Sequence, residues 1–70
     1  MAKQKILEPY QQRVVEEKAD LDGKITRLMD FINSEDFKPV NTVEKTRLEQ
    51  QFHVMLTYSK ILRERIHNFN

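Results

Sequence analysis

The side chains best suited to binding a charged ligand lie in the first half of the chain. Tyr10 offers an aromatic ring on which a base can stack, and Lys24 and Thr26 offer a cation and a hydroxyl beside Gly23. A glycine inside a helix costs about 1 kcal/mol relative to alanine, so we expect a ligand or another helix to approach that backbone. Phosphate oxygens and base edges suit this combination of groups.

Each of these residues also has a common structural explanation. Exposed lysines and helix threonines are frequent, and a tyrosine at a helix start is more often a core or staple residue than a stacking platform. On one helix, Tyr10 and Lys24 would lie about 21 Å apart, too far to grip one small ligand. Tyr10 of one subunit and Lys24 of an antiparallel neighbour could do so. Three arginines are further candidates for phosphate clamps: Arg13, Arg63 and Arg65.

No catalytic or metal-binding motif is present in the sequence. The chain has no cysteine and one glycine, which excludes a thiolate metal site and a glycine-rich phosphate loop. Asp20 and Asp22 resemble the start of a calcium loop, but the third acidic position and the closing glutamate are missing. We therefore expect no enzyme, no metal site and no cofactor.

Two long helices must position the candidate residues. Pro9 suits the first position of a helix, and Asn41 followed by Glu44 is typical of a second helix start. Residues at alternating spacings of three and four, nearly all of them apolar, form a stripe on each helix. The first stripe is Val14, Lys18, Leu21, Ile25, Leu28 and Ile32, and the second is Leu48, Phe52, Met55, Ser59, Leu62, Ile66 and Phe69.

These signals predict an all-α fold, an antiparallel two-helix hairpin within a single domain. We predict a short arm or helix over 1–8, helices over 9–33 and 42–69, and a loop over 34–41. Several apolar residues lie off the stripes: Val15, Met29, Val54, Leu56, Tyr58 and Ile61. They either widen the stripes or contact another subunit. Because a hairpin of 70 residues without cysteine is only marginally stable alone, we favour a homo-oligomer.

The charge balance argues against some partners. The 12 lysines and arginines nearly match the 11 aspartates and glutamates, which leaves a formal charge of +1. Proteins that bind long nucleic acids usually carry a basic surplus on one face, so a helical DNA-binding regulator is disfavoured. No apolar run approaches the roughly 20 residues of a membrane span, and the N-terminus lacks the apolar core of a signal peptide. We therefore expect a cytoplasmic protein without a membrane partner.

Several motifs together resemble the phage anti-CBASS cyclic-oligonucleotide sponge family. The resemblance covers about residues 9–69, and the motifs occur in the family's order: Tyr10-Gln-Gln-Arg-Val14, Glu17-x-x-x-Leu21-x-x-Lys24, Phe31-Ile32 and Tyr58-Ser59 followed by Glu64-Arg65-Ile66. The resemblance implies a phage protein, working in the cytoplasm of the infected bacterium, that sequesters cyclic second messengers such as cyclic GMP-AMP and cyclic tri-AMP without cleaving them. CBASS effectors would then stay inactive.

The same resemblance implies a compact homohexamer and assigns roles to particular residues. Tyr10 would stack on a base of a cyclic dinucleotide, while Lys24 and Thr26 of the partner subunit would contact its phosphate-ribose ring. Gln12 and Arg65 are the candidates for a separate cyclic trinucleotide site. The alternative function is a structural or adaptor coiled-coil protein whose apolar faces bind another protein.

Overall fold

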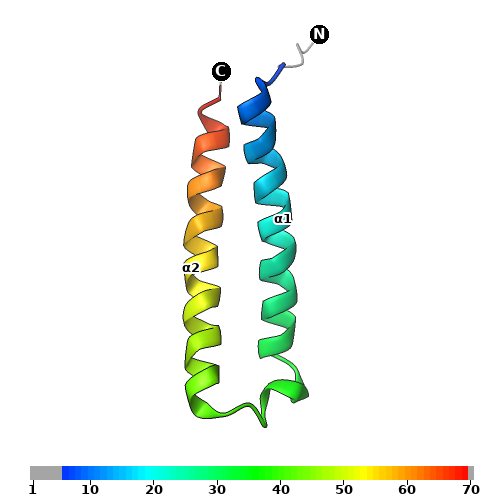
Figure 1. Ribbon diagram of the computed structural model, residues 1–70, viewed down its shortest axis with the longest axis vertical. Helices are drawn as coiled ribbons and strands as arrows, with labels where there is room; N and C mark the ends of the chain where they lie inside the picture. The colour runs from blue at the N-terminus through cyan, green and yellow to red at the C-terminus, as the bar shows by residue number, and fades with distance from the viewer. Residues whose placement is uncertain (1–5, 70) are drawn as a thin grey trace.

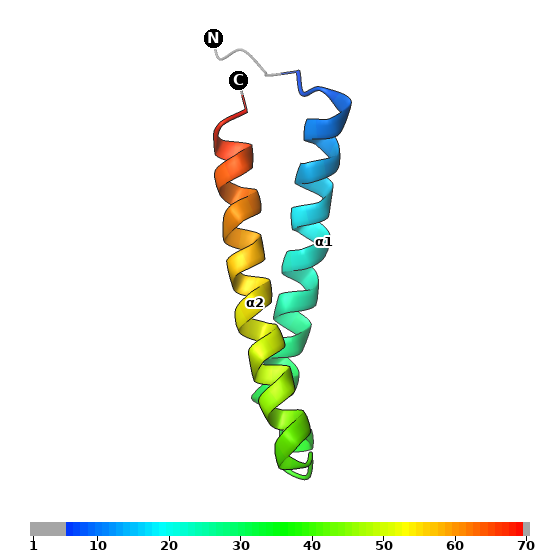
Figure 2. The ribbon, with the colours of Figure 1, turned by 60° about the vertical axis from the view of Figure 1, so that its left-hand side comes forward.

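The computed structural model describes residues 6–69, which form two long helices and no strand. Helix α1 spans Pro9–Ile32, helix α2 spans Thr42–His67, and a short 3-10 turn, η1, spans Glu35–Phe37. The two helices run antiparallel, side by side (Figures 1 and 2), in a rod of 53 × 19 × 17 Å. The predicted all-helical hairpin is confirmed for this part of the chain.

The helix bounds differ slightly from the predicted ones. Helix α1 ends one residue before the predicted position 33, and α2 ends two residues before position 69. Of the predicted N-terminal arm or helix, residues 1–5 lie outside the described residues, and residues 6–8 precede α1 without helical structure.

Local capping sets the start of each helix. Pro9 occupies the first turn of α1, and the Glu8 backbone N–H donates a hydrogen bond to Gln11 Oε1 at 2.9 Å. At the start of α2, Asn41 Oδ1 accepts a hydrogen bond from the Glu44 backbone N–H at 2.9 Å. These contacts satisfy backbone groups that have no partner inside the helix.

Aromatic contacts pack the loop between the helices against the ends of both helices. The rings of Phe31, in the last turn of α1, and Phe37, in η1, meet edge to face with centroids 5.8 Å apart. Lys45 Nζ lies 5.4 Å from the centroid of the Phe37 ring, within the range of a cation–π contact. The loop therefore packs against the first turn of α2.

The core of the hairpin is built from the two predicted stripes. Its buried side chains are Val14, Leu21, Ile25 and Leu62, and its partly buried ones are Phe52, Met55, Ile66 and Phe69. Leu62 alone among the described residues is completely buried. Full burial of such a side chain contributes roughly 1.5–3 kcal/mol, whereas fixing the backbone of each residue costs roughly 1–2 kcal/mol of conformational entropy. A seam with few buried side chains therefore leaves the isolated hairpin marginally stable.

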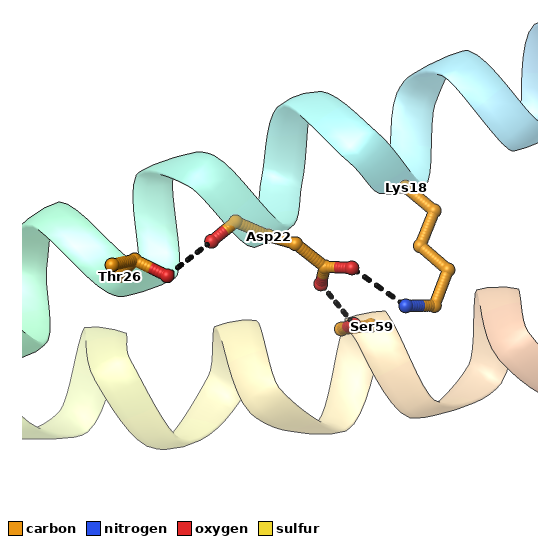
Figure 3. A network of polar contacts seen from close by, with 4 residues as sticks. All are labelled: Lys18, Asp22, Thr26 and Ser59. Atoms are coloured by element: carbon orange, nitrogen blue, oxygen red, sulfur yellow. Dashed lines mark hydrogen bonds and ion pairs between the residues drawn. The ribbon is translucent and has the colours of Figure 1, made fainter.

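A polar layer interrupts the seam where Lys18 and Ser59 replace apolar residues. Asp22 Oδ2 accepts a hydrogen bond from Lys18 Nζ at 2.6 Å, and Asp22 Oδ1 accepts one from Ser59 Oγ across the helix interface at 2.5 Å (Figure 3). A slide of one helix by a turn would separate Asp22 from Ser59 and leave a partly buried carboxylate without that donor. The layer therefore favours one register of α1 against α2.

Much of the remaining apolar surface is uncovered. Val54 is 67% exposed and Ile61 is 49% exposed, and Leu56, Tyr58 and Met29 are each 42% exposed. These are five of the six residues that lie off the stripes. Within residues 6–69, neither helix is apolar enough over a sufficient length to cross a membrane.

The polar layer predicts a pH dependence of stability. Hydrogen bonds from Lys18 and Ser59 lower the pKa of Asp22 below its ordinary value. The stabilisation by this carboxylate is therefore present above pH ~3.9, the ordinary pKa of aspartate, and is lost as pH falls through the lower folded pKa. We expect Asp22→Asn to lower the melting temperature at pH 7, and this difference from the parent to shrink below pH ~3.9.

The matched control is Asp30→Asn, which changes an exposed carboxylate on α1 that has no ion pair or hydrogen bond within residues 6–69. Circular dichroism melts at several pH values measure both variants. A constant difference between parent and Asp22→Asn from pH 7 to pH 2 would contradict the expected role of the charge.

Candidate functional site

Tyr10 combines a packing contact with an exposed surface. Its ring contacts Phe69 beyond the end of α2, with centroids 6.2 Å apart and planes at 71°. The residue is 53% exposed, and its hydroxyl accepts a hydrogen bond of 3.4 Å from Gln11 Nε2. Tyr10 therefore has a packing role between the start of α1 and the end of α2, and enough of its side chain remains exposed for a base to stack on it.

Lys24 lines a hollow on one flank of the hairpin. This acidic hollow, of about 470 Å³, lies between α1 and Tyr58, and its lining is Arg13, Glu16, Glu17, Asp20, Leu21, Lys24 and Tyr58. Lys24 is exposed and makes no ion pair within the described part of the chain. Three carboxylates outnumber two cations here, so the hollow of a single chain does not favour a dianionic ligand.

Thr26 lines a different hollow. Two positions along a helix correspond to a rotation of about 200°, which places Thr26 on the other side of α1 from Lys24. We call this second hollow, of about 320 Å³, the basic groove, and its lining is Lys18, Asp22, Ile25, Thr26, Leu56, Ser59, Lys60 and Arg63. Within one chain, the structure does not bring Lys24 and Thr26 to the same hollow.

The hydrogen bonds in the basic groove limit what its hydroxyls can offer. Thr26 Oγ1 donates to the Asp22 backbone carbonyl at 3.1 Å, and Ser59 Oγ donates to the Asp22 carboxylate (Figure 3). Each hydroxyl has one proton and two lone pairs. In these conformations both hydroxyls can therefore accept a further hydrogen bond but cannot donate one.

The two candidate residues for a trinucleotide site are exposed at the same end of the hairpin. Gln12, near the start of α1, donates a hydrogen bond of 3.3 Å to Glu16. Arg65 lies in the last turn of α2. No hydrogen bond joins the two side chains in residues 6–69, so their joint role stays a prediction.

Within residues 6–69, no atom of α2 lies within 4 Å of the position that a Cβ at Gly23 would occupy. A Cβ atom at this position would meet Arg27 Nη1, the end of a flexible side chain, at 3.4 Å. The hairpin itself therefore gives no reason for a glycine here, and a close approach would have to come from a ligand or another subunit.

Within residues 6–69, no group of three histidine, aspartate or glutamate side chains could hold a metal ion. Asp20 and Asp22 lie within α1, and Asp22 already accepts hydrogen bonds from Lys18 and Ser59.

Sequence reasoning missed Lys60 as a groove residue. It stands next to Ser59, and Arg63 follows it at the i+3 position, where side chains share one helix face. This spacing beside a polar stripe position is a signal that could have pointed to the basic groove.

Comparison with known proteins gives two matches. The family model described as Sequestin matches residues 8–68. An uncharacterized 7.5 kDa protein of Enterobacteria phage T4 is 42% identical over 60 residues, which cover 86% of this chain and 94% of the phage protein. No solved structure matches the chain.

Substitutions at Gly23 test whether anything approaches this backbone. Gly23→Ala should raise the free energy of unfolding by up to about 1 kcal/mol per chain, because alanine is the better helix former. Gly23→Leu should weaken cyclic dinucleotide binding or assembly, while circular dichroism still reports the helix content of the parent. Ala19→Leu, at an exposed position of the same helix, is the control for side-chain size. Parent-like binding and assembly in Gly23→Leu would mean that nothing packs against this position.

Proposed function

This chain belongs to the Sequestin family, and we propose that it is a phage protein that binds and sequesters cyclic di- and trinucleotide second messengers without cleaving them. The match confirms, at the level of the family, the resemblance recognised from the sequence motifs. The family name suggests sequestration, and the similar protein comes from a phage. Bound by this protein in the cytoplasm of the infected bacterium, messengers such as cyclic GMP-AMP and cyclic tri-AMP would not reach CBASS effectors.

The accessible ring of Tyr10 is the observation that carries the proposal. An aromatic ring that stacks on a base contributes about 1–3 kcal/mol, and stacking tolerates different bases. Phe69 holds the Tyr10 ring from one side, which lowers the entropy lost when a base stacks on it. Such a platform suits a protein that binds nucleotides and performs no chemistry on them.

A binding site of this kind needs more than one chain. Tyr10 and Lys24 are separated by 14 positions of α1, about 21 Å, and they would act on one ligand only across two subunits. The exposed apolar residues of α2 support assembly, because a lone hairpin has nothing to bury them against. We therefore include a homo-oligomer in the proposal, with six chains as the number that the family resemblance implies.

Assembly can be tested by light scattering at micromolar concentration. We expect a particle of several chains, six being the implied number. Val54→Glu and Ile61→Glu, which place charges on the exposed face of α2, should reduce the particle mass. Val43→Glu, at a 70% exposed position near the start of α2, is the matched control. A parent that is monomeric would refute both the assembly and the shared site.

Ligand binding can be tested by calorimetry with cyclic GMP-AMP and cyclic tri-AMP. Tyr10→Ala and Lys24→Ala should each weaken binding of the dinucleotide about tenfold or more, because each removes roughly 1–3 kcal/mol of stacking or charge-assisted hydrogen bonding. Neither substitution should change the particle mass measured by light scattering. The parent should also melt at a higher temperature with ligand, and the ligand should be recovered intact by chromatography. Parent-like binding by both variants would place the site elsewhere.

The alternative is an adaptor that binds another protein through α2. Its support is an apolar hollow of about 360 Å³ lined by His53, Val54, Thr57, Tyr58 and Ile61. A parent whose melting temperature does not respond to micromolar cyclic nucleotide would favour this function.

A further inference from the structure

The basic groove holds two cations that nothing neutralises within the described residues. Lys60 and Arg63 lie on one face of α2 and are exposed, and their side chains make no ion pair or hydrogen bond in residues 6–69. The third cation, Lys18, is paired with Asp22 at 2.6 Å. The groove therefore carries a surplus of positive charge beside a partly apolar floor of Ile25 and Leu56.

The two flanks of the hairpin differ in charge. The acidic hollow has more carboxylates than cations, whereas the basic groove has three cations and one carboxylate. An anion that approaches a single chain is therefore favoured on the groove side and disfavoured on the hollow side. Lys24, the cation named by the family resemblance, lies on the disfavoured side.

We propose that the basic groove binds a sugar-phosphate unit of a nucleotide, with Lys60 and Arg63 donating hydrogen bonds to the phosphate. This proposal rests on the proposed function, in which the ligand is a cyclic oligonucleotide, and adds residues that the resemblance did not assign. The volume of about 320 Å³ is at the small end of the range for ligand sites, roughly 300–1,000 Å³. The groove therefore fits one nucleotide unit and leaves the rest of a cyclic ligand to other contacts.

The hydroxyls of the groove favour a sugar-phosphate over a phosphodiester alone. The hydroxyls of Thr26 and Ser59 donate their hydrogen bonds to Asp22, so each presents only acceptor lone pairs to a ligand. A phosphodiester carries no proton to donate to them, but a ribose hydroxyl does. Cations and hydroxyl acceptors that line one groove therefore match a phosphate attached to ribose.

The test is calorimetry with cyclic GMP-AMP on the full chain and on two groove variants, Lys60→Gln and Arg63→Gln. Each variant removes one charge and keeps a polar side chain of similar length. We expect each to weaken binding about tenfold, the usual effect of losing a charge-assisted hydrogen bond. Arg47→Gln is the matched control, since it makes the same change on α2 about 24 Å along the helix from Arg63 and should bind within twofold of the parent.

The possible results separate this proposal from the proposed function. Parent-like binding by both groove variants, with weakened binding in Tyr10→Ala and Lys24→Ala, would overturn the groove and leave the function standing. A change of particle mass in the groove variants would also overturn it, since the cations would then belong to an interface between copies.

A parent that binds no cyclic nucleotide would refute the proposed function. The groove would still be tested, with a second ligand. Adenosine 5′-monophosphate would then be titrated against the ¹⁵N-labelled protein. Amide shifts at Lys60 and Arg63 that disappear in the doubly substituted protein would support the groove. Their absence in the parent would overturn it.

Discussion

In a hairpin of two helices, each helix can bury only the face that contacts the other helix. This constraint determines which apolar side chains are buried and which remain exposed. The seam between α1 and α2 buries four side chains among the described residues, while apolar residues such as Val54 and Ile61 remain on the surface. The hairpin therefore holds its shape through a narrow contact and leaves a large surface for other molecules. Family membership, the exposed apolar face and the exposed candidate residues are all compatible with a protein that acts by binding.

Compared with an apolar pair, the polar layer contributes less stability to this seam but favours one register of the helices. An apolar pair in place of Lys18 and Ser59 would bury more hydrocarbon, yet it would allow the helices to slide by a turn at little cost. The Asp22 carboxylate, held by both donors, ties α1 to α2 at one position. The backbone carbonyl of the same residue accepts a hydrogen bond from the Thr26 hydroxyl, so the helix register and the hydrogen bonding of the basic groove both depend on one aspartate.

Local signals in the sequence were sufficient for the fold and insufficient for the site. Pro9 and Asn41 predicted where the helices start, and the spacing that includes Leu21 and Leu62 predicted the seam. Asp22 lies off the first stripe, so the pattern could not reveal that it joins Lys18 to Ser59. Lys24 and Thr26 were predicted to act together, and the hairpin places them on opposite flanks. Whether two chains bring them to one ligand depends on the packing between subunits, which the pattern of one chain does not encode.

The contact between Tyr10 and Phe69 links the start of one helix to the end of the other. Phe69 lies beyond the last turn of α2, where its backbone N–H still donates a hydrogen bond to the Ile66 carbonyl at 3.1 Å. Helix ends open and close more readily than helix centres, and each opening of this turn would remove the support of the Tyr10 ring. A base stacked on Tyr10 would therefore favour the closed turn. Occupancy of a site at the start of α1 would then slow amide hydrogen exchange at the end of α2.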